Sequence, residues 1–226
     1  MAAASERTVL VTGFDPFGGE SVNPSWEAVK QLPREITGAK IATLQVPTVF
    51  YDSLALVREA IIEHRPEIIL CVGQAGGRAE ITPERIAINI NDASIADNAE
   101  QQPLDEPIAA SAPAAYFSTL PVKAMVAAVR EAGVPARLSN SAGTFVCNHL
   151  MFGVLDFIAR EGASFGVADA RAGFVHVPFV PEQVAPGAED PALPLDQIVR
   201  GLEAAITAAL QHEGAADAQL ALGATH

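Results

Sequence analysis

The sequence predicts a single α/β domain built around a mainly parallel β-sheet. Short β-branched runs end in glycine or are followed by a glycine-containing loop at 8–14 and 68–73, and an amphipathic helix follows the first of them. The run at 68–73 is apolar throughout, which is typical of a parallel strand buried on both faces. The chain has 226 residues, of which 50% are hydrophobic, and neither a repeat nor a linker divides it. We therefore expect one domain over residues 1–213.

Hydrophobic periodicity places the other elements along the chain. Helices are expected at 23–32, 51–64, 121–132, 148–160 and 195–211. Strands are expected at 40–46, 85–91, 136–139 and 172–178. Residues 92–116 form a long connection rich in Pro and Asp, of a length often used for lids or binding loops. The Ala/Gly-rich tail at 214–226 is expected to be disordered.

Composition excludes several classes of partner. The net charge is −13 with only 14 Lys and Arg residues, and no basic stripe is present, so nucleic acid and anionic membranes are not expected partners. Two cysteines are too few for a disulfide framework, and residues 1–7 lack the form of a signal peptide. No apolar run approaches the roughly 18 residues of a membrane-spanning helix. We expect a soluble protein in the cytoplasm.

Cys147 is the candidate nucleophile. It follows Gly143 and Thr144 and stands at the start of the helix expected at 148–160, where unpaired amide donors and the helix dipole stabilise a thiolate and lower the pKa of a thiol. Backbone N–H groups of the same turn could donate to an oxyanion. The polar residues of this helix, Asn148, Asp156 and Arg160, are expected to face water. The alternative is a buried cysteine that only packs, which is how we interpret Cys71 within its strand.

Five histidines compete as the general base. His64, His212 and His226 lie at helix ends or at the chain end, where a solvated side chain is expected. On a helix, side chains at i and i+2 point about 200° apart, which directs His149 away from Cys147. His176 lies in an apolar run near a strand end and must find a hydrogen-bond partner, so it is the favoured base. Its acid partner could be Glu80, Glu84 or Asp92, and spacing leaves these three open.

Metal and nucleotide sites are disfavoured by the spacing of the relevant residues. Zinc held by Cys147, His149 and His176 would need a Cys-x-His pair, which is not a usual zinc spacing. The glycines at 73–78 are too few and wrongly spaced for a phosphate-binding loop or a dinucleotide fingerprint. We expect neither a metal nor a cofactor.

Five motifs, in this order, make the chain similar to type I pyroglutamyl peptidases, the pyrrolidone-carboxylate peptidases, a family of cysteine peptidases. The motifs are Val11-Thr12-Gly13-Phe14-Asp15-Pro16-Phe17-Gly18-Gly19, Asn23-Pro24-Ser25-Trp26, the pair 73–78 and 81–85, Gly143-Thr144-Phe145-Val146-Cys147-Asn148-His149, and Gly173-Phe174-Val175-His176-Val177-Pro178. The resemblance spans nearly the whole chain. It implies a single-domain three-layer α/β/α sandwich with a mostly parallel, twisted mixed sheet, and a catalytic triad of Cys147, His176 and Glu84.

The same resemblance implies the substrate, an N-terminal pyroglutamyl (5-oxoprolyl) group on a peptide. The apolar pocket would contain Phe14, Phe17, Ile95 and Phe145, with polar contacts from Asn23 and Gln74. A small lactam suits this mixture, because its ring carbons bury against aromatics while its N–H and C=O need polar partners. The implied reaction is acyl transfer, in which Cys147 forms a thioester that water then hydrolyses.

The resemblance also implies a homotetramer without a cofactor. The sequence departs from the family pattern at two places. An arginine often stands in the family where this chain has Ser94, so no charge assistance is expected from this position. The segment 161–171 is longer than usual, and we expect a different approach to His176.

Two other functions remain open at this point. Glutamine-type amidotransferases also use a Cys-His-Glu set, but their histidine and glutamate both follow the cysteine, whereas Glu84 precedes Cys147 here. A small-molecule binding protein could keep such a pocket without turnover, although retention of all three triad residues argues against it.

Overall fold

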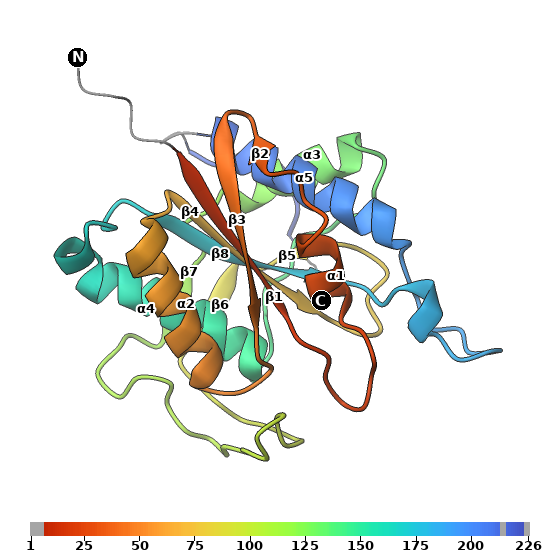
Figure 1. The fold of residues 1–226 in the computed structure, drawn as a ribbon, viewed down its shortest axis with the longest axis horizontal. Coiled ribbons are helices and arrows are strands. Elements are labelled where there is room, and N and C mark those ends of the chain that lie inside the picture. The colour runs from red at the N-terminus through yellow and green to blue at the C-terminus, as the bar shows by residue number, and fades with distance from the viewer. Residues whose placement is uncertain (1–6, 213–215, 224–226) are drawn as a thin grey trace.

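A computed structural model of the chain describes residues 7–212 and 216–223. Its centre is a twisted, mixed sheet of six strands in the order β2-β3-β1-β4-β8-β5 (Figure 1). The strands are β1 (Thr8–Phe14), β2 (Glu35–Ile36), β3 (Ala39–Val46), β4 (Ile68–Gln74), β5 (Thr82–Pro83) and β8 (Arg171–Val177). The four inner strands are parallel, and the short edge strands β2 and β5 are antiparallel to their neighbours.

Helices cover both faces of the sheet and enclose two cores. On one face lie α1 (Pro24–Val29), α3 (Val122–Glu131) and α5 (Leu195–Gln211), and on the other lie α2 (Asp52–His64) and α4 (Val146–Phe165) (Figure 1). Strand β1 supplies both cores, because Val9 and Val11 face one and Leu10 and Phe14 face the other. The predicted three-layer α/β/α sandwich is confirmed. No helix among the described residues combines the length and apolarity needed to cross a bilayer.

The strands predicted at 85–91 and 136–139 differ from the structure. Only β6 (Ile86–Ile88) forms in the first range, and it pairs with β7 (Ala115–Phe117) in a separate antiparallel ribbon. The second range runs beside the segment that precedes β6 and meets it in two isolated parallel bridges, at Ala136 and Ser139. The isoleucines of the period-2 pattern therefore lie on the more exposed face of a separate ribbon, with Ala87 buried between them, rather than in a strand of the main sheet.

Two helices differ in length from their predictions. Helix α1 ends at Val29, and residues 30–32 continue as tight turns rather than as helix. Helix α4 continues to Phe165 and ends at Gly166, whose positive φ of 73° suits glycine. The long segment 161–171 is thus the last turn of α4 and its link to the amino end of β8. Since His176 lies near the opposite end of β8, this segment does not border the approach to it, contrary to our expectation.

The C-terminal segment caps helix α3. Pro121 precedes α3 and offers no side-chain acceptor, but the carboxylate of Asp217 accepts hydrogen bonds from the backbone N–H groups of Lys123 and Ala124 at 2.9 and 3.1 Å. Lys123 Nζ also donates to the carbonyl of Leu220. Residues 216–223 of the tail predicted to be disordered therefore have a defined place, whereas 213–215 and 224–226 lie outside the described residues.

The Asp217 cap yields a stability prediction. Asp217→Ala should lower the free energy of unfolding by about 1 kcal/mol, because two amide donors at the start of α3 lose their acceptor. Asp217→Asn, which keeps an acceptor oxygen, should lose less. Urea unfolding followed by circular dichroism measures both, with the exposed Asp190→Ala as the control. Equal stability of Asp217→Ala and the control would show that the segment does not dock in solution.

Candidate active site

A small cavity opens at the carboxyl ends of the parallel strands, the edge where α/β sheets commonly bind ligands. Its volume is about 150 Å³, smaller than the roughly 300–1,000 Å³ of sites for drug-sized molecules. The ends of β1, β3 and β4 and the start of α4 supply its walls. The lining residues are Phe14, Phe17, Asn23, Thr48, Gln74, Phe145 and Cys147.

Cys147 is the second residue of α4, and its side chain lines this cavity. Its sulfur rests on Gly73 near the end of β4, where a Cβ atom would lie 3.0 Å from Cys147 Sγ and 2.7 Å from the Phe174 ring. Real Cβ atoms essentially never approach that ring position so closely. A side chain at position 73 would clash with the Phe174 ring and press on the sulfur, so glycine suits the close approach of the helix start to the sheet.

His176 lies beside Gly73 on the neighbouring strand, since the two residues are paired in the β4–β8 register. Paired residues of a sheet project to the same face, so the imidazole is on the side of the sheet that carries the Cys147 sulfur. His176 Nδ1 lies 2.8 Å from Glu84 Oε1. Glu84 is fully buried directly after β5, and its backbone N–H bonds to the carbonyl of Phe174. The structure thus brings Cys147, His176 and Glu84 to one place.

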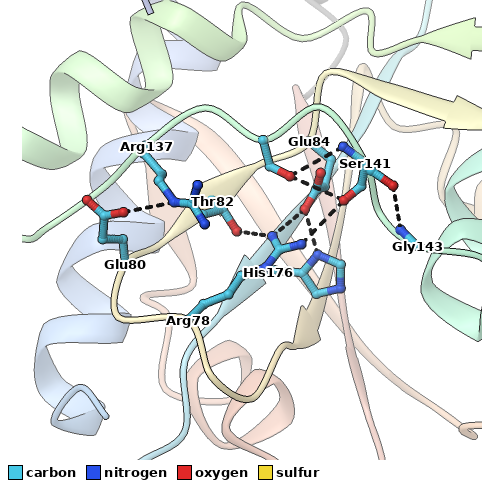
Figure 2. A network of polar contacts seen from close by, with 9 residues as sticks. Arg78, Glu80, Thr82, Glu84, Arg137, Ser141, Gly143 and His176 are labelled. Atoms are coloured by element: carbon cyan, nitrogen blue, oxygen red, sulfur yellow. Dashed lines mark hydrogen bonds and ion pairs between the residues drawn. The ribbon is translucent and has the colours of Figure 1, made fainter. Parts of the chain in front are cut away.

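Arg78 joins this group, although we did not single it out from the sequence (Figure 2). Its guanidinium donates to Glu84 Oε1 at 2.6 Å, to Thr82 Oγ1 at 2.5 Å and to the carbonyl of Ser141 at 3.3 Å. Ser141 Oγ in turn accepts from the N–H of Gly143 in the loop that leads to Cys147. One arginine therefore ties the buried carboxylate to the loop of the candidate nucleophile. The signal in the sequence was a charged residue closing a glycine-rich loop.

The other two candidate acids lie apart from His176. Glu80 pairs with Arg137 at 2.9 Å on the surface, next to the network of Glu84 (Figure 2). Asp92 is exposed, and its backbone exchanges hydrogen bonds with Thr144. The geometry therefore favours Glu84 among the three acids that spacing had left open.

Comparison with known proteins identifies the family of this chain. A family profile described as pyroglutamyl peptidase matches residues 7–212. The chain belongs to the pyroglutamyl peptidase family. The pyrrolidone-carboxylate peptidase of Bacillus licheniformis is 55% identical over 208 residues, which are 92% of this chain and 94% of that protein. That of Streptococcus pyogenes serotype M5 is 52% identical over 218 residues, 96% of this chain and 99% of that protein.

Solved structures of the pyroglutamyl peptidase family share the whole fold. The crystal structure of pyroglutamyl peptidase I from Bacillus amyloliquefaciens matches with a TM-score of 0.89 at 51% identity, covering 96% of this chain and 100% of that chain. The pyrrolidone carboxyl peptidase from Thermococcus litoralis matches with a TM-score of 0.89 at 38% identity and the same coverage. The resemblance stated from five motifs is therefore confirmed.

Within this pyroglutamyl peptidase fold, the pKa shifts of His176 and Glu84 define their protonation. Burial lowers the pKa of His176 despite the opposing effect of Glu84, so the imidazole is neutral at pH 7. Burial alone would raise the pKa of Glu84, but hydrogen bonds from His176, Ser139 and Arg78 lower it. An ionised Glu84 accepts the proton of Nδ1, which leaves Nε2 of His176 as a free acceptor.

The thiol of Cys147 differs from our expectation. Burial raises its pKa to about 12, and the charge of Glu84 adds to the rise. The start of α4 favours a thiolate, but burial removes hydration from the sulfur and is the largest contribution to the shift. The resting pair is therefore a neutral thiol and a neutral imidazole. Activation requires transfer of the thiol proton to His176.

The two residues after Cys147 fix the start of α4. Asn148, expected to face water, is fully buried and bonds the backbone of Ile88 in both directions, with its Oδ1 accepting and its Nδ2 donating. His149 is also fully buried; its Nε2 accepts from the N–H of Tyr51 and its Nδ1 donates to Asn91 Oδ1, both at 3.1 Å. Burial lowers the pKa of His149 to about 4. Both ring nitrogens are occupied, so His149 has a structural place.

The predicted pocket residues separate into two groups. Phe14, Phe17, Asn23, Gln74 and Phe145 line the cavity, with the rings of Phe17 and Phe145 at 5.4 Å between centroids. Ile95 is 55% exposed on the long connection and is not among the lining residues. Thr48 lines the cavity directly after β3 and was missed, because no periodicity marks a single loop threonine.

Two further expectations concern charge and metal. Ser94 is exposed in the long connection and is not a lining residue of the cavity, so it adds no charge there. Among residues 7–212 and 216–223, no group of three or more His, Cys, Asp or Glu side chains is placed to hold a metal ion.

The raised pKa of Cys147 predicts the pH dependence of its alkylation. With a thiol pKa of about 12, the thiolate fraction should rise about tenfold for each pH unit between pH 7 and pH 10, and iodoacetamide should modify Cys147 at a rate that follows it. The measurement uses a Cys71→Ala background, so that only one thiol of the chain reacts. A rate that is already maximal at pH 6 would contradict this and indicate a preformed thiolate.

Proposed function

We propose that this chain is a cysteine peptidase that removes the N-terminal pyroglutamyl residue from peptides, with the single domain over residues 1–213 as its catalytic unit. The observation that carries the proposal is the hydrogen-bonded array of Glu84 and His176 beside a Cys147 sulfur that forms the floor of a small aromatic cavity. The names of the relatives support the substrate, since two of them are pyrrolidone-carboxylate peptidases.

The geometry supports an acyl-transfer mechanism. His176 Nε2 takes the proton of Cys147 as the sulfur attacks the pyroglutamyl carbonyl carbon, and Glu84 stabilises the imidazolium that forms. The first backbone N–H groups of α4 lack intrahelical partners and are placed to donate to the oxyanion. His176 then gives the proton to the leaving amine, which departs and leaves a thioester. Water deprotonated by His176 hydrolyses the thioester and restores the thiol.

Arg78 supports this cycle by keeping Glu84 ionised in a buried position. A carboxylate without a cation at 0% exposure would take up a proton and could no longer accept from Nδ1. Arg78 also offsets the negative charge that would otherwise oppose a thiolate at Cys147. We assign it a positioning role rather than contact with substrate.

The first test of this function compares the two cysteines. The wild-type protein should release fluorophore from pyroglutamyl-aminomethylcoumarin, and Cys147→Ser should lower turnover by roughly 10³-fold or more, because the nucleophile is lost. Cys71→Ser should leave turnover nearly unchanged, since Cys71 is buried in the middle of β4 and only packs.

Circular dichroism of both variants separates lost chemistry from lost fold. Comparable losses in the two folded variants would contradict the assignment of Cys147. A folded wild type that binds the substrate without releasing fluorophore would instead indicate a binding protein.

The second test concerns specificity. Phenylalanine contacts cannot distinguish pyroglutamate from proline, which differ by a carbonyl and by the charge on nitrogen. A prolyl substrate would leave the polar groups of the cavity unpaired and would have to desolvate an ammonium, which in comparable sites costs roughly 10⁴ in kcat/KM. Side-by-side measurement on pyroglutamyl- and prolyl-aminomethylcoumarin checks this. Values within about tenfold of each other would mean that the cavity recognises only shape.

We also propose that the protein forms a homotetramer. Support comes from the ribbon of β6 and β7, whose outer face presents Ile88 and Phe117, the latter 67% exposed. Exposed apolar faces of this kind are typical of contact surfaces between subunits. Light scattering should give a mass four times the 23.6 kDa of one chain. Phe117→Asp should reduce that mass, and a monomeric wild type would contradict the proposal.

For the compartment, we propose the cytoplasm, where the Cys147 thiol stays reduced. The two cysteines are both free, as expected for a protein of a reducing compartment. The proposed partners are N-terminally pyroglutamylated peptides, and the net charge of −13 still argues against nucleic acid and anionic membranes.

A further inference from the structure

We propose that Gln183 is a positioning residue that fixes the side-chain amide of Gln74, so that the NH2 group of Gln74 faces the cavity and donates to the carbonyl oxygen of the substrate ring. This inference rests on the proposed function and specifies how the site recognises its lactam. It begins from a short chain of hydrogen bonds outside the catalytic array.

A backbone donor sets the direction of this chain of bonds. The N–H of Val180 donates to an oxygen of Gln183 at 3.2 Å, and a backbone N–H can only donate. The atom of Gln183 that faces Val180 must therefore be the carbonyl oxygen Oε1. Its other terminal atom is then the amide nitrogen, which donates to Gln74 at 3.0 Å. The atom of Gln74 that receives this bond must be its oxygen, so its Nε2 is directed elsewhere.

The amide nitrogen of Gln74 is left as an open donor. No hydrogen bond of Nε2 to another described residue is present, and Nε2 is not among the buried polar atoms that lack a partner. Gln74 lines the cavity, which is the open space next to this side chain. An exchange of the oxygen and nitrogen of Gln74 would set two amino groups against each other at Gln183, so the orientation is fixed.

The other polar side chains of the cavity have most of their hydrogen-bonding groups occupied. Asn23 uses one of its two amide N–H groups for the carbonyl of Asp15 and its oxygen for the N–H and hydroxyl of Ser25. Thr48 donates its hydroxyl proton to the carbonyl of Asp15 and keeps only its acceptor capacity. Among the lining side chains other than the thiol, the NH2 of Gln74 and one N–H of Asn23 remain as donors, and Thr48 remains as an acceptor. A lactam ring offers the complementary pair, a C=O and an N–H.

The position of Gln183 in the fold makes it a rigid support. It ends the short 3₁₀ turn η1 (Pro181–Gln183), which follows β8 after a few residues. Gln74 ends β4 and is paired with Val177 at the end of β8. Gln183 lies on the extension of β8, the adjacent parallel strand. The ring of Phe179 packs on Gly76, where a Cβ atom would be blocked, and this contact holds the loop after Gln74 against the same extension.

Two substitutions of Gln183 separate orientation from packing. Gln183→Met keeps the length of the side chain but frees the Gln74 amide to rotate, and KM for pyroglutamyl-aminomethylcoumarin should rise about three- to tenfold. At pH 8 the carboxylate of Gln183→Glu has two acceptor oxygens. The NH2 of Gln74 should then turn toward this carboxylate, and the carbonyl of Gln74 should turn toward the cavity. KM should then rise more than about tenfold, because two carbonyl oxygens meet. In both variants kcat should stay within about twofold.

A double substitution tests whether Gln183 acts through Gln74. In a Gln74→Met background, where no amide remains to be oriented, Gln183→Met should have no further effect on KM. The matched control is Glu182→Gln, an exposed change on the same turn that should leave KM and kcat unchanged. The rate of Cys147 alkylation by iodoacetamide should be the same in all variants, which shows that the catalytic array is intact.

Calorimetric measurement of 2-pyrrolidone binding keeps the test of Gln183 separate from the test of the proposed function. Its dissociation constant should rise in the order wild type, Gln183→Met, Gln183→Glu, even if the protein does not turn over the fluorogenic substrate. A wild type that binds 2-pyrrolidone without turnover would refute the peptidase proposal alone. KM and dissociation constants within twofold of wild type in both variants, or a full effect of Gln183→Met in the Gln74→Met background, would overturn the role of Gln183.

Discussion

The close approach of α4 to the sheet at Gly73 is the constraint on which the rest of the site depends. A sulfur can rest on β4 only where the strand has no side chain, and the same position is paired with His176 in the next strand. The strand register therefore delivers base and nucleophile together, without contributions from a flexible loop. Functional groups on a rigid sheet or at the start of a helix are held in position more accurately than groups on loops.

Burial favours the uncharged form of each of the three groups of the array. It keeps the imidazole of His176 neutral and able to accept a proton, and it keeps the thiol of Cys147 protonated. Glu84 would also be neutral at 0% exposure, but Arg78 and His176 surround one of its oxygens with donors. The charged groups of this site are thus Glu84 and Arg78, which form an ion pair on the Nδ1 side of His176. The side that meets substrate is uncharged until reaction begins.

The sequence predicted the main strands and pointed to Cys147 and His176 because each has a local signal, whereas the three layers and the choice of Glu84 came only from the resemblance to the family. Apolar runs marked β1, β4 and β8, and helix periodicity marked α2 and α5. It misplaced the ribbon of β6, since a period of two does not reveal which sheet a strand joins. Arg78, Thr48 and the buried Asn148 were missed or misplaced, because their partners lie in distant segments and pair only in the folded chain.

The protonated state of Cys147 has a consequence for the lifetime of the protein. Peroxides oxidise thiolates far faster than thiols, and exposed thiolates progress to sulfenic and then irreversible sulfinic acids. A nucleophile that holds its proton until a substrate carbonyl arrives is a poor target for such oxidants, and the small cavity further limits their access. Burial of the thiol therefore protects the sulfur from oxidation between turnovers, and each cycle then needs a proton transfer to activate it.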